Sequence, residues 1–419
     1  MTKKIFSLLL IVASVFTSCK NNSENNNEPE SHDLPEGKWR GELLLSSEEK
    51  LPFIFELRKN DLGTTFEILN GEEKIFVDDI EVNGNEITIH LPLFDSHIKA
   101  TYADKKLNGK WINNARKENN EIPFSAEHAI DKRFNTSSKP NHNITGKWEV
   151  GFYNPKDSVP VVTKAIGEFQ QKAGIITGTF MTTTGDYRFL EGVLDGDILY
   201  LSCFDGAHAF LFKANVQGDR MEGEFWSGIH HYEKWVGERN ESATLPDPEK
   251  LTSLKEGVEK ISFTFPDLNG NNVSLEDQKF KNKVTIVQIL GSWCPNCADE
   301  TKFLSDIYKQ YNSRGVEIIG LCFETTKEFE KASANVKKMA QGLNADYTFL
   351  IAGTSNKQEA AQALPFLNHV LSFPTTMFID KKGNVRKIHT GFSGPATGKY
   401  YDTFVSETTA FIEKLLAEK

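Results

Sequence analysis

The feature that most restricts the fold of this chain is a buried-strand pattern that runs directly into a pair of cysteines. Lys283–Leu290 is a nearly continuous run of apolar and β-branched residues, which is typical of a strand buried on both faces of a sheet. The sequence Gly-Ser-Trp-Cys-Pro-Asn-Cys follows, and after Cys297 apolar residues recur at helical spacing until Gly315, beyond the expected helix end. This order predicts that Cys294 lies where a buried strand ends and a helix begins.

The predicted position of Cys294 has a chemical consequence. Unpaired backbone N–H groups and the helix dipole favour negative charge at a helix N-terminus, and a thiolate is the attacking species in disulfide exchange. Cys297 lies one helical turn further on, so it can close on Cys294 and release a mixed disulfide. Pro295 at the first helical position loses no hydrogen bond. We therefore expect a redox-active pair, with a structural disulfide as the alternative.

Metal binding is a weaker interpretation of these cysteines. A structural zinc site usually needs four ligands, and neither a second Cys-x-x-Cys pair nor a pair of histidines lies nearby in the sequence. His230 and His231 are adjacent, but adjacent side chains on a strand point to opposite faces, so these two cannot chelate one metal together. The sequence therefore predicts neither a metal site nor a cofactor.

Three motifs in combination resemble the TlpA-type branch of the thioredoxin superfamily. They are Pro266–Gly270, Trp293–Cys297 and Phe373–Thr376, and the resemblance covers about residues 258–419. It implies a thioredoxin fold and a membrane-tethered thiol–disulfide oxidoreductase, usually a reductant, in the bacterial envelope. The implied partners are disulfides of exported proteins and a membrane or envelope thiol that supplies electrons.

The resemblance also implies roles for individual residues. Pro374 would be a cis proline beside the cysteine pair, which leaves the backbone of Phe373 free to bond an incoming disulfide partner in extended form. Trp293 and Pro295 would complete the substrate-binding surface around Cys294.

The chain departs from the thioredoxin pattern at several positions. Gln288 stands where thioredoxin proper has a buried Asp near the resolving thiol, and a glutamine cannot accept a proton. Glu300 lies three residues after Cys297 on the same helix face, and relatives often have Glu there, so we assign it a proton-handling role. The alternative is that Glu300 only stabilises the N-terminal region of the helix. Asn296 between the cysteines leaves the direction of electron flow open.

The N-terminus has the pattern of an export signal. Two lysines precede the twelve-residue apolar run Ile5–Phe16, which as a helix would span only about 18 Å, short of the ~30 Å core of a membrane. The small residues before Cys19 resemble a bacterial lipobox, which implies removal of residues 1–18 and lipidation of Cys19. Residues 19–35 would then be a flexible tether. An ordinary secretory signal is the alternative.

Between the tether and the cysteine domain the sequence repeats itself. Four landmarks recur in one order: Gly37–Trp39 as Gly146–Trp148, Asn83–Asn85 as Asp195–Asp197, Phe94-Asp95 with His97 as Phe204-Asp205 with His208, and Gly109–Trp111 as Gly223–Phe225. Alternating strand patterns and Asn-Gly or Asp-Gly turns predict about eight antiparallel strands in each copy, at residues 36–130 and 144–240. The repeated Phe-Asp…His reads more simply as a structural turn than as a ligand site.

These observations predict a multidomain chain. Its fold class is two tandem antiparallel β-meander or barrel-like units, a linker at residues 241–257, and an α/β thioredoxin fold at residues 258–419. The predicted location is the bacterial cell envelope, as a membrane-anchored lipoprotein facing the periplasm, with the β units as spacers. The net charge of −10 argues against nucleic acid as the main partner. Nothing in the sequence predicts the oligomeric state.

Two other functions are compatible with parts of this pattern. A peroxiredoxin-like peroxidase would use Cys294 to attack peroxide, but Gly291 stands where such enzymes place a polarising Thr. A ligand-binding envelope lipoprotein would use the β units, with the redox domain ancillary.

Overall fold

The computed structural model describes residues 34–60 and 63–419 of the 419-residue chain. The expected signal at residues 1–18 and the expected lipidation at Cys19 lie outside the described residues. Residues 34–419 form one compact unit. No helix within the described part of the chain is long and apolar enough to cross a membrane.

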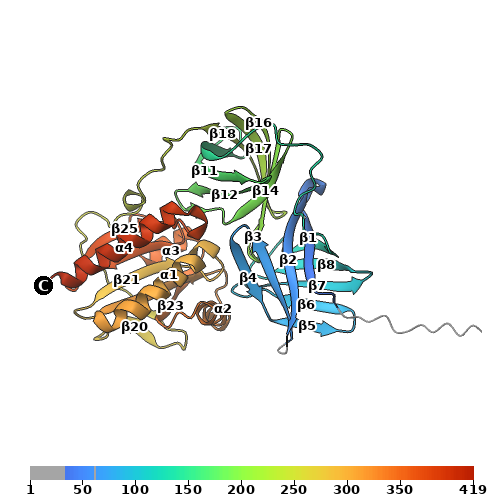
Figure 1. The fold of residues 1–419 in the computed structure, drawn as a ribbon. Coiled ribbons are helices and arrows are strands. Elements are labelled where there is room, and N and C mark those ends of the chain that lie inside the picture. The colour runs from blue at the N-terminus through green and yellow to red at the C-terminus, as the bar shows by residue number, and fades with distance from the viewer. Residues whose placement is uncertain (1–33, 61–62) are drawn as a thin grey trace, which may run out of the picture. The chain divides into compact units, whose positions relative to one another are not determined.

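The first β unit is a nine-stranded antiparallel sheet (Figure 1). Its strands are β1 Gly37–Leu44, β2 Lys50–Asn60, β3 Gly63–Asn70, β4 Glu73–Val77, β5 Ile80–Asn83, β6 Glu86–His90, β7 Ser96–Ala103, β8 Lys106–Asn113 and β9 Glu121–His128. The spatial order is β4-β3-β2-β1-β9-β8-β7-β6-β5, a meander in which β1 and β9 pair and β4 and β5 form the two edges. The sheet therefore curls around its core without closing between β4 and β5.

The second β unit closes into a ring. Its strands are β10 Gly146–Tyr153, β11 Thr163–Lys172, β12 Ile175–Thr182, β13 Gly185–Asp186, β14 Leu190–Asp195, β15 Ile198–Phe204, β16 Ala209–Gln217, β17 Arg220–Ser227 and β18 His231–Arg239. Strand β12 pairs with both β11 and β14, which closes the ring, while the two-residue β13 pairs only with β12. Each sheet thus has nine strands instead of the eight expected, and in this sheet the additional strand is the short β13.

The two sheets begin in the same way, as the repeated Gly-Lys-Trp motif predicts. Trp39 is buried and its indole N–H donates to Pro35 O at 3.2 Å, four residues earlier. Trp148 is equally buried and donates to Ile144 O at 2.9 Å, again four residues earlier. A large buried side chain whose polar atom is satisfied by the preceding loop fixes the start of each sheet in the same geometry.

The C-terminal region contains a five-stranded sheet of order β23-β22-β21-β24-β25. Its strands are β21 Val284–Leu290, β22 Val316–Glu324, β23 Thr348–Thr354, β24 Thr375–Ile379 and β25 Val385–Thr390. The helices of this region are α1 Pro295–Tyr311, α2 Phe329–Gly342, α3 Lys357–Ala363 and α4 Lys399–Ala417. A short hairpin precedes them, formed by β19 Thr264–Pro266 and β20 Asn272–Ser274. Strands β21, β22 and β23 are parallel, whereas β24 and β25 are antiparallel to their neighbours.

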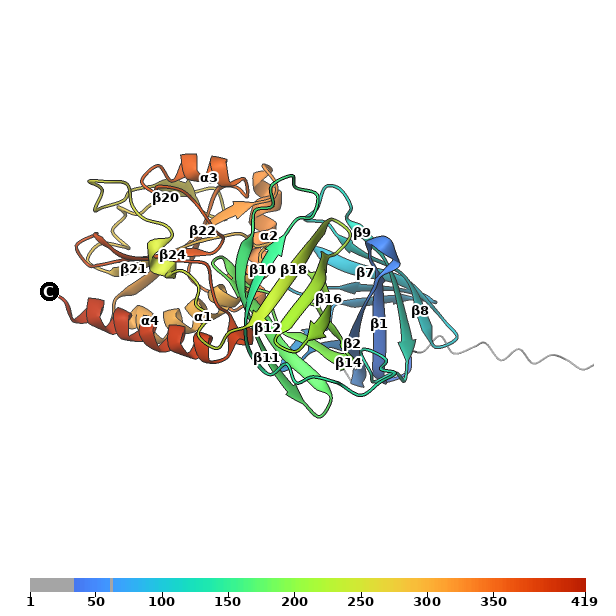
Figure 2. The same cartoon turned by 90° about the horizontal axis from the view of Figure 1, so that it is seen from above.

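Helices cover both faces of this sheet, with α1 and α4 on one face and α3 on the other (Figures 1 and 2). Phe303 of α1 meets Phe404 of α4 with ring centroids 5.4 Å apart. Every residue of the central strand β21 is buried, which is why its sequence is almost uninterruptedly apolar.

The expected linker at residues 241–257 packs against both the second β unit and the C-terminal region. Ala243 and Thr252 are buried, and Glu249 forms an ion pair of 2.8 Å with Lys387. The segment therefore contributes side chains to the compact unit, although its composition is polar.

Candidate active site

The cysteine motif lies at the junction that the sequence predicts. Strand β21 ends at Leu290 and α1 begins at Pro295, so Cys294 is the residue that caps the helix. Its sulfur accepts a hydrogen bond from the backbone N–H of Cys297 at 3.3 Å. Both cysteines are free thiols in this structure. The geometry offers a backbone donor to the Cys294 sulfur at the positive end of the helix dipole, where a thiolate is stabilised.

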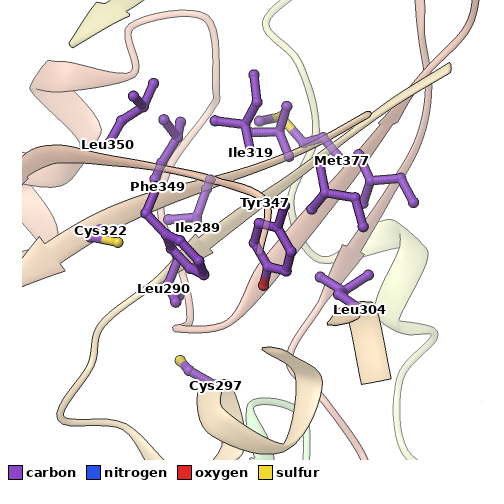
Figure 3. Close-up of a cluster of buried hydrophobic side chains, with 14 of the residues drawn as sticks. Ile289, Leu290, Cys297, Leu304, Ile319, Cys322, Tyr347, Phe349, Leu350 and Met377 are labelled. Carbon is purple, nitrogen blue, oxygen red and sulfur yellow. The ribbon is translucent and has the colours of Figure 1, made fainter. Parts of the chain in front are cut away.

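The two thiols have different environments. Cys294 retains 7% of its surface and its thiol donates to Phe373 O at 3.5 Å. Cys297 is fully buried, and burial together with the adjacent Cys294 raises the pKa of its thiol well above the usual value. Figure 3 shows the Cys297 side chain directed from the start of α1 toward the buried cluster that includes Phe349 and Leu290. Only Cys294 is therefore placed to meet an incoming molecule.

Glu300 lies beneath the cysteine pair and is fully buried. Its carboxylate accepts hydrogen bonds from Gln288 Nε2 at 2.8 Å and from Thr376 Oγ1 at 2.8 Å. Burial outweighs both hydrogen bonds and raises the pKa of Glu300 to about 7. The carboxyl group can therefore gain or lose a proton near neutral pH, and its charge contributes to the raised pKa of the Cys297 thiol.

Gln288 connects this carboxyl group to the cysteine motif. Its amide nitrogen also donates to Cys297 O at 3.3 Å, while its oxygen accepts from Thr301 Oγ1 at 3.0 Å and from the Tyr347 hydroxyl at 3.3 Å. Because the Cys297 carbonyl can only accept a hydrogen bond, Gln288 is held with its nitrogen toward Cys297 O and Glu300.

The proline loop faces the same cysteine. The Phe373–Pro374 peptide bond is cis, as the resemblance implies, and Pro374 O accepts from Gly391 N–H at 2.9 Å. The Phe373 ring lies edge-on to Trp293, with centroids 5.8 Å apart. Trp293 is itself fixed by its indole N–H, which donates to Phe323 O at 2.9 Å. The structure thus brings Trp293, Phe373 and Pro374 together around Cys294.

One buried acid near the site was not identified from the sequence. Glu324, at the end of β22, accepts from the Ser292 N–H at 2.8 Å and from the Ser292 hydroxyl at 2.6 Å. These bonds hold the turn immediately before Trp293, and burial raises the pKa of Glu324. A glutamate that ends an otherwise apolar strand pattern is the signal that could have revealed it.

Among residues 34–60 and 63–419 there is no group of three or more His, Cys, Asp or Glu side chains that could hold a metal ion.

Comparisons with known proteins agree with this chemistry. The family described as Redoxin matches residues 255–403. The thiol-disulfide oxidoreductase ResA of Bacillus subtilis is 30% identical over 141 residues, which are 33% of this chain and 69% of that protein. ResA of Geobacillus thermodenitrificans is 29% identical over 140 residues, covering 33% of this chain and 72% of that protein.

Among solved structures, a putative thiol:disulfide interchange protein DsbE from Chlorobium tepidum aligns with a TM-score of 0.31 at 20% identity, covering 39% of this chain and 100% of that chain. The relatives in sequence carry the assignment: the chain is a protein-disulfide oxidoreductase and belongs to the TlpA-type, thioredoxin-like family of thiol–disulfide oxidoreductases.

Proposed function

We propose that this protein is a membrane-tethered reductase that exchanges with disulfides of exported proteins through Cys294 and Cys297. The observation that carries the proposal is the asymmetry of the pair. Cys294 caps a helix N-terminus and accepts a backbone N–H, whereas the Cys297 thiol is fully buried and its pKa is raised. An attacking cysteine that keeps some surface, beside a fully buried second thiol, is the arrangement that two-step exchange requires.

In the first step the Cys294 thiolate attacks one sulfur of a substrate disulfide. The substrate S–S bond breaks, a mixed disulfide forms with Cys294, and the departing substrate thiolate takes up a proton from solvent. In the second step the Cys297 thiol gives its proton to Glu300 and attacks the Cys294 sulfur. The Cys294–Cys297 disulfide forms, the bond between Cys294 and the substrate breaks, and the second substrate thiolate leaves and takes up a proton from solvent. Two electrons have then passed to the substrate, and a membrane or envelope dithiol reduces the Cys294–Cys297 disulfide and is itself oxidised.

The proposed roles of the neighbouring residues follow from their contacts. Glu300, with a pKa raised to about 7 by burial, suits transfer of a proton near neutral pH. Phe373 and Pro374 would receive the backbone of the substrate, since Phe373 O lies 3.5 Å from the Cys294 sulfur. Trp293 and Pro295 would complete the substrate-binding surface.

Tethering and export rest on the sequence. The apolar run Ile5–Phe16 followed by Cys19 supports export and lipidation in a bacterial cell envelope, with the protein facing the periplasm. The proposed domains are the β units at residues 36–130 and 144–240 and the redox domain at 258–419. Labelling of growing cells with a radioactive fatty acid, followed by isolation of this protein and of a Cys19→Ser variant, tests the lipid anchor.

Reduction of insulin disulfides by the prereduced protein tests the reaction. The parent protein turns over, and both Cys294→Ser and Cys297→Ser lose turnover, while the buried Cys322→Ser serves as a matched control that retains it. Parent turnover in either active-site variant would rule out the paired mechanism. Formation of a sulfenic acid at Cys294 with peroxide, faster than disulfide exchange, would instead favour a peroxidase.

A further inference from the structure

The redox site is covered on its Trp293 side by turns of both β units. Phe94 and Ala207, from the repeated Phe-Asp turns, belong to the same buried cluster as Cys294. Lys338 of α2 donates to Phe94 O at 3.0 Å. The cavity that remains between these turns and Trp293 has a volume of about 20 Å³, room for about one water molecule. An interpretation of the β units as spacers does not account for these contacts.

A second segment of the second β unit covers the other side of the site. This segment, Thr183–Arg188, contains β13, and we call it the cover segment. Its Asp186 O accepts from the Asn296 amide at 3.3 Å, and Asn296 lies between the two cysteines. Its Thr184 O accepts from the hydroxyl of Ser372, the residue before Phe373, at 3.1 Å.

The cover segment also binds the loop that follows β25. The Asp186 carboxylate accepts from Gly394 N–H at 2.7 Å. Gly391 lies directly against the segment, since a Cβ built on it would be 2.8 Å from Thr183 O. The segment therefore touches the cysteine motif, the start of the proline loop and the β25 loop.

Arg188 fixes the end of the cover segment in a buried ionic cluster. Its guanidinium group contacts Asp299 on α1, Glu73 on β4 at 2.7 Å and Asp205 at 3.3 Å. Burial raises the pKa of Asp299 to about 7 and raises that of Glu73, while Asp205 stays ionised with a pKa of about 2. One cation thus joins both β units to the helix that carries Cys297, and removal of it would leave buried carboxylates unpaired.

We propose that the cover segment is a specificity-determining wall, which restricts the redox site to disulfides with little bulk around the reacting sulfurs. Cys294 keeps only 7% of its surface, and the cover segment is bonded to Asn296, close to Cys294 in sequence, and to Ser372 in the proline loop, so a partner must reach the Cys294 sulfur past this segment. A small or narrow disulfide meets this condition, whereas a disulfide on a broad protein surface collides with the cover segment. The inference rests on the proposed function and names the kind of substrate that the site accepts.

Gly185→Ala tests the role of the cover segment without removing a charge. A Cβ on Gly185 would lie 1.9 Å from the Asn296 amide nitrogen, so the Asn296 side chain must turn away and loses the hydrogen bond to Asp186 O that holds the cover segment against the cysteine motif. Gly174→Ala is the control, because Gly174, in the turn between β11 and β12, also has a positive φ (85°, against 154° at Gly185) but no atom within 4 Å of the added Cβ. Asp186→Ala, which loses the bond to Gly394 N–H, is a second variant for use if Gly185→Ala does not fold.

The measurement is the ratio of kcat/KM for insulin to that for oxidised glutathione. Displacement of the cover segment raises this ratio by about fivefold or more, through faster reaction with insulin, while glutathione changes by less than about twofold. Gly174→Ala leaves both rates unchanged. An unchanged ratio, or a lower rate with insulin, in the folded variants overturns the proposal.

Alkylation of Cys294 tests the role of the cover segment independently of the proposed function. Two rates of Cys294 modification are measured by mass spectrometry, one with a bulky maleimide-linked polyethylene glycol and one with the small reagent iodoacetamide. If the cover segment limits access, the ratio of the first rate to the second rises in Gly185→Ala and not in Gly174→Ala. This readout needs no turnover. A parent protein that reduces neither disulfide contradicts the proposed function, and equal alkylation ratios in parent and variant contradict the cover segment.

Discussion

Replacement of Glu300 with glutamine tests whether a protonated carboxyl group lies beneath the cysteine pair. Glu300 is fully buried and is held by Gln288 and Thr376 at 2.8 Å each. Its pKa rises from 4.5 to about 7, with burial as the largest cause. The folded protein therefore holds this proton at pH values where the unfolded chain has already released it.

The sign and size of the effect follow from proton linkage. Between pH 4.5 and pH 7 the folded state binds more protons than the unfolded state, so the free energy of unfolding falls as pH rises. One pKa unit corresponds to ~1.4 kcal/mol, so the full loss attributable to Glu300 is about 3 kcal/mol. Glutamine has a similar shape and no titratable proton, and Glu300→Gln removes this loss.

The assay is denaturant unfolding of the parent and Glu300→Gln in a pH series from about 5 to about 8. The stability of the variant relative to the parent increases by about 2–3 kcal/mol across the series. Glu330→Gln, which removes an acidic group from an exposed position of α2, is the control for the loss of a carboxylate as such. If Glu300→Gln and the parent show the same pH dependence, Glu300 does not hold a proton in the folded state, and its proposed role in proton transfer fails.

Three further changes test other parts of the structure. Thr376→Val removes a hydroxyl that stabilises the ionised form of Glu300, so the pH series described above shifts its midpoint to higher pH. Phe180→Ala empties a fully buried position of the second β unit and lowers the free energy of unfolding by ~3–5 kcal/mol, measured by denaturant titration. Asn356→Ala removes the N-cap of α3, whose side chain accepts from two backbone N–H groups at 2.9 and 3.1 Å, and costs about 1 kcal/mol in the same titration.

For each of these three variants, a different result would contradict the structural interpretation. A midpoint that moves to lower pH in Thr376→Val would show that the hydroxyl does not favour the charged carboxylate. A loss below about 1 kcal/mol for Phe180→Ala would place this ring outside a packed core. Unchanged stability in Asn356→Ala, alongside an equally stable exposed control such as Gln358→Ala, would show that the cap bonds contribute nothing.

The geometry of the cysteine motif was predictable because it depends on residues that are close in sequence. The apolar run before Gly291 requires a buried strand, the helical spacing after Cys297 requires a helix, and Cys294 must then lie between them. Glu300 could be identified because helical spacing places it on the face of Cys297 and because Gln288 cannot accept a proton. The structure adds the pairing of Glu300 with Gln288, which joins α1 to β21.

The contacts between the β units and the redox site were not predictable in the same way. Arg188 contacts Asp299, which is 111 residues away in the sequence, and Glu73, which is 115 residues away. No local sequence pattern links positions so far apart. An arginine in a turn-rich segment is usually exposed, so its burial depends on partners supplied by other parts of the chain. The turn at Asp205 was expected, and its carboxylate does accept the N–H groups of Ala207 and His208, but its additional contact with Arg188 was not.

Trapping of the mixed disulfide tests the central claim most directly. Reduced Cys297→Ser protein, incubated with oxidised insulin disulfides and analysed by peptide mass spectrometry, should hold one insulin chain covalently on Cys294, because no second thiol releases it. Cys294→Ser protein should hold none, since the Cys297 thiol is fully buried. A stable adduct on Cys297 in Cys294→Ser, or no adduct in Cys297→Ser, would contradict the assignment of Cys294 as the attacking thiol.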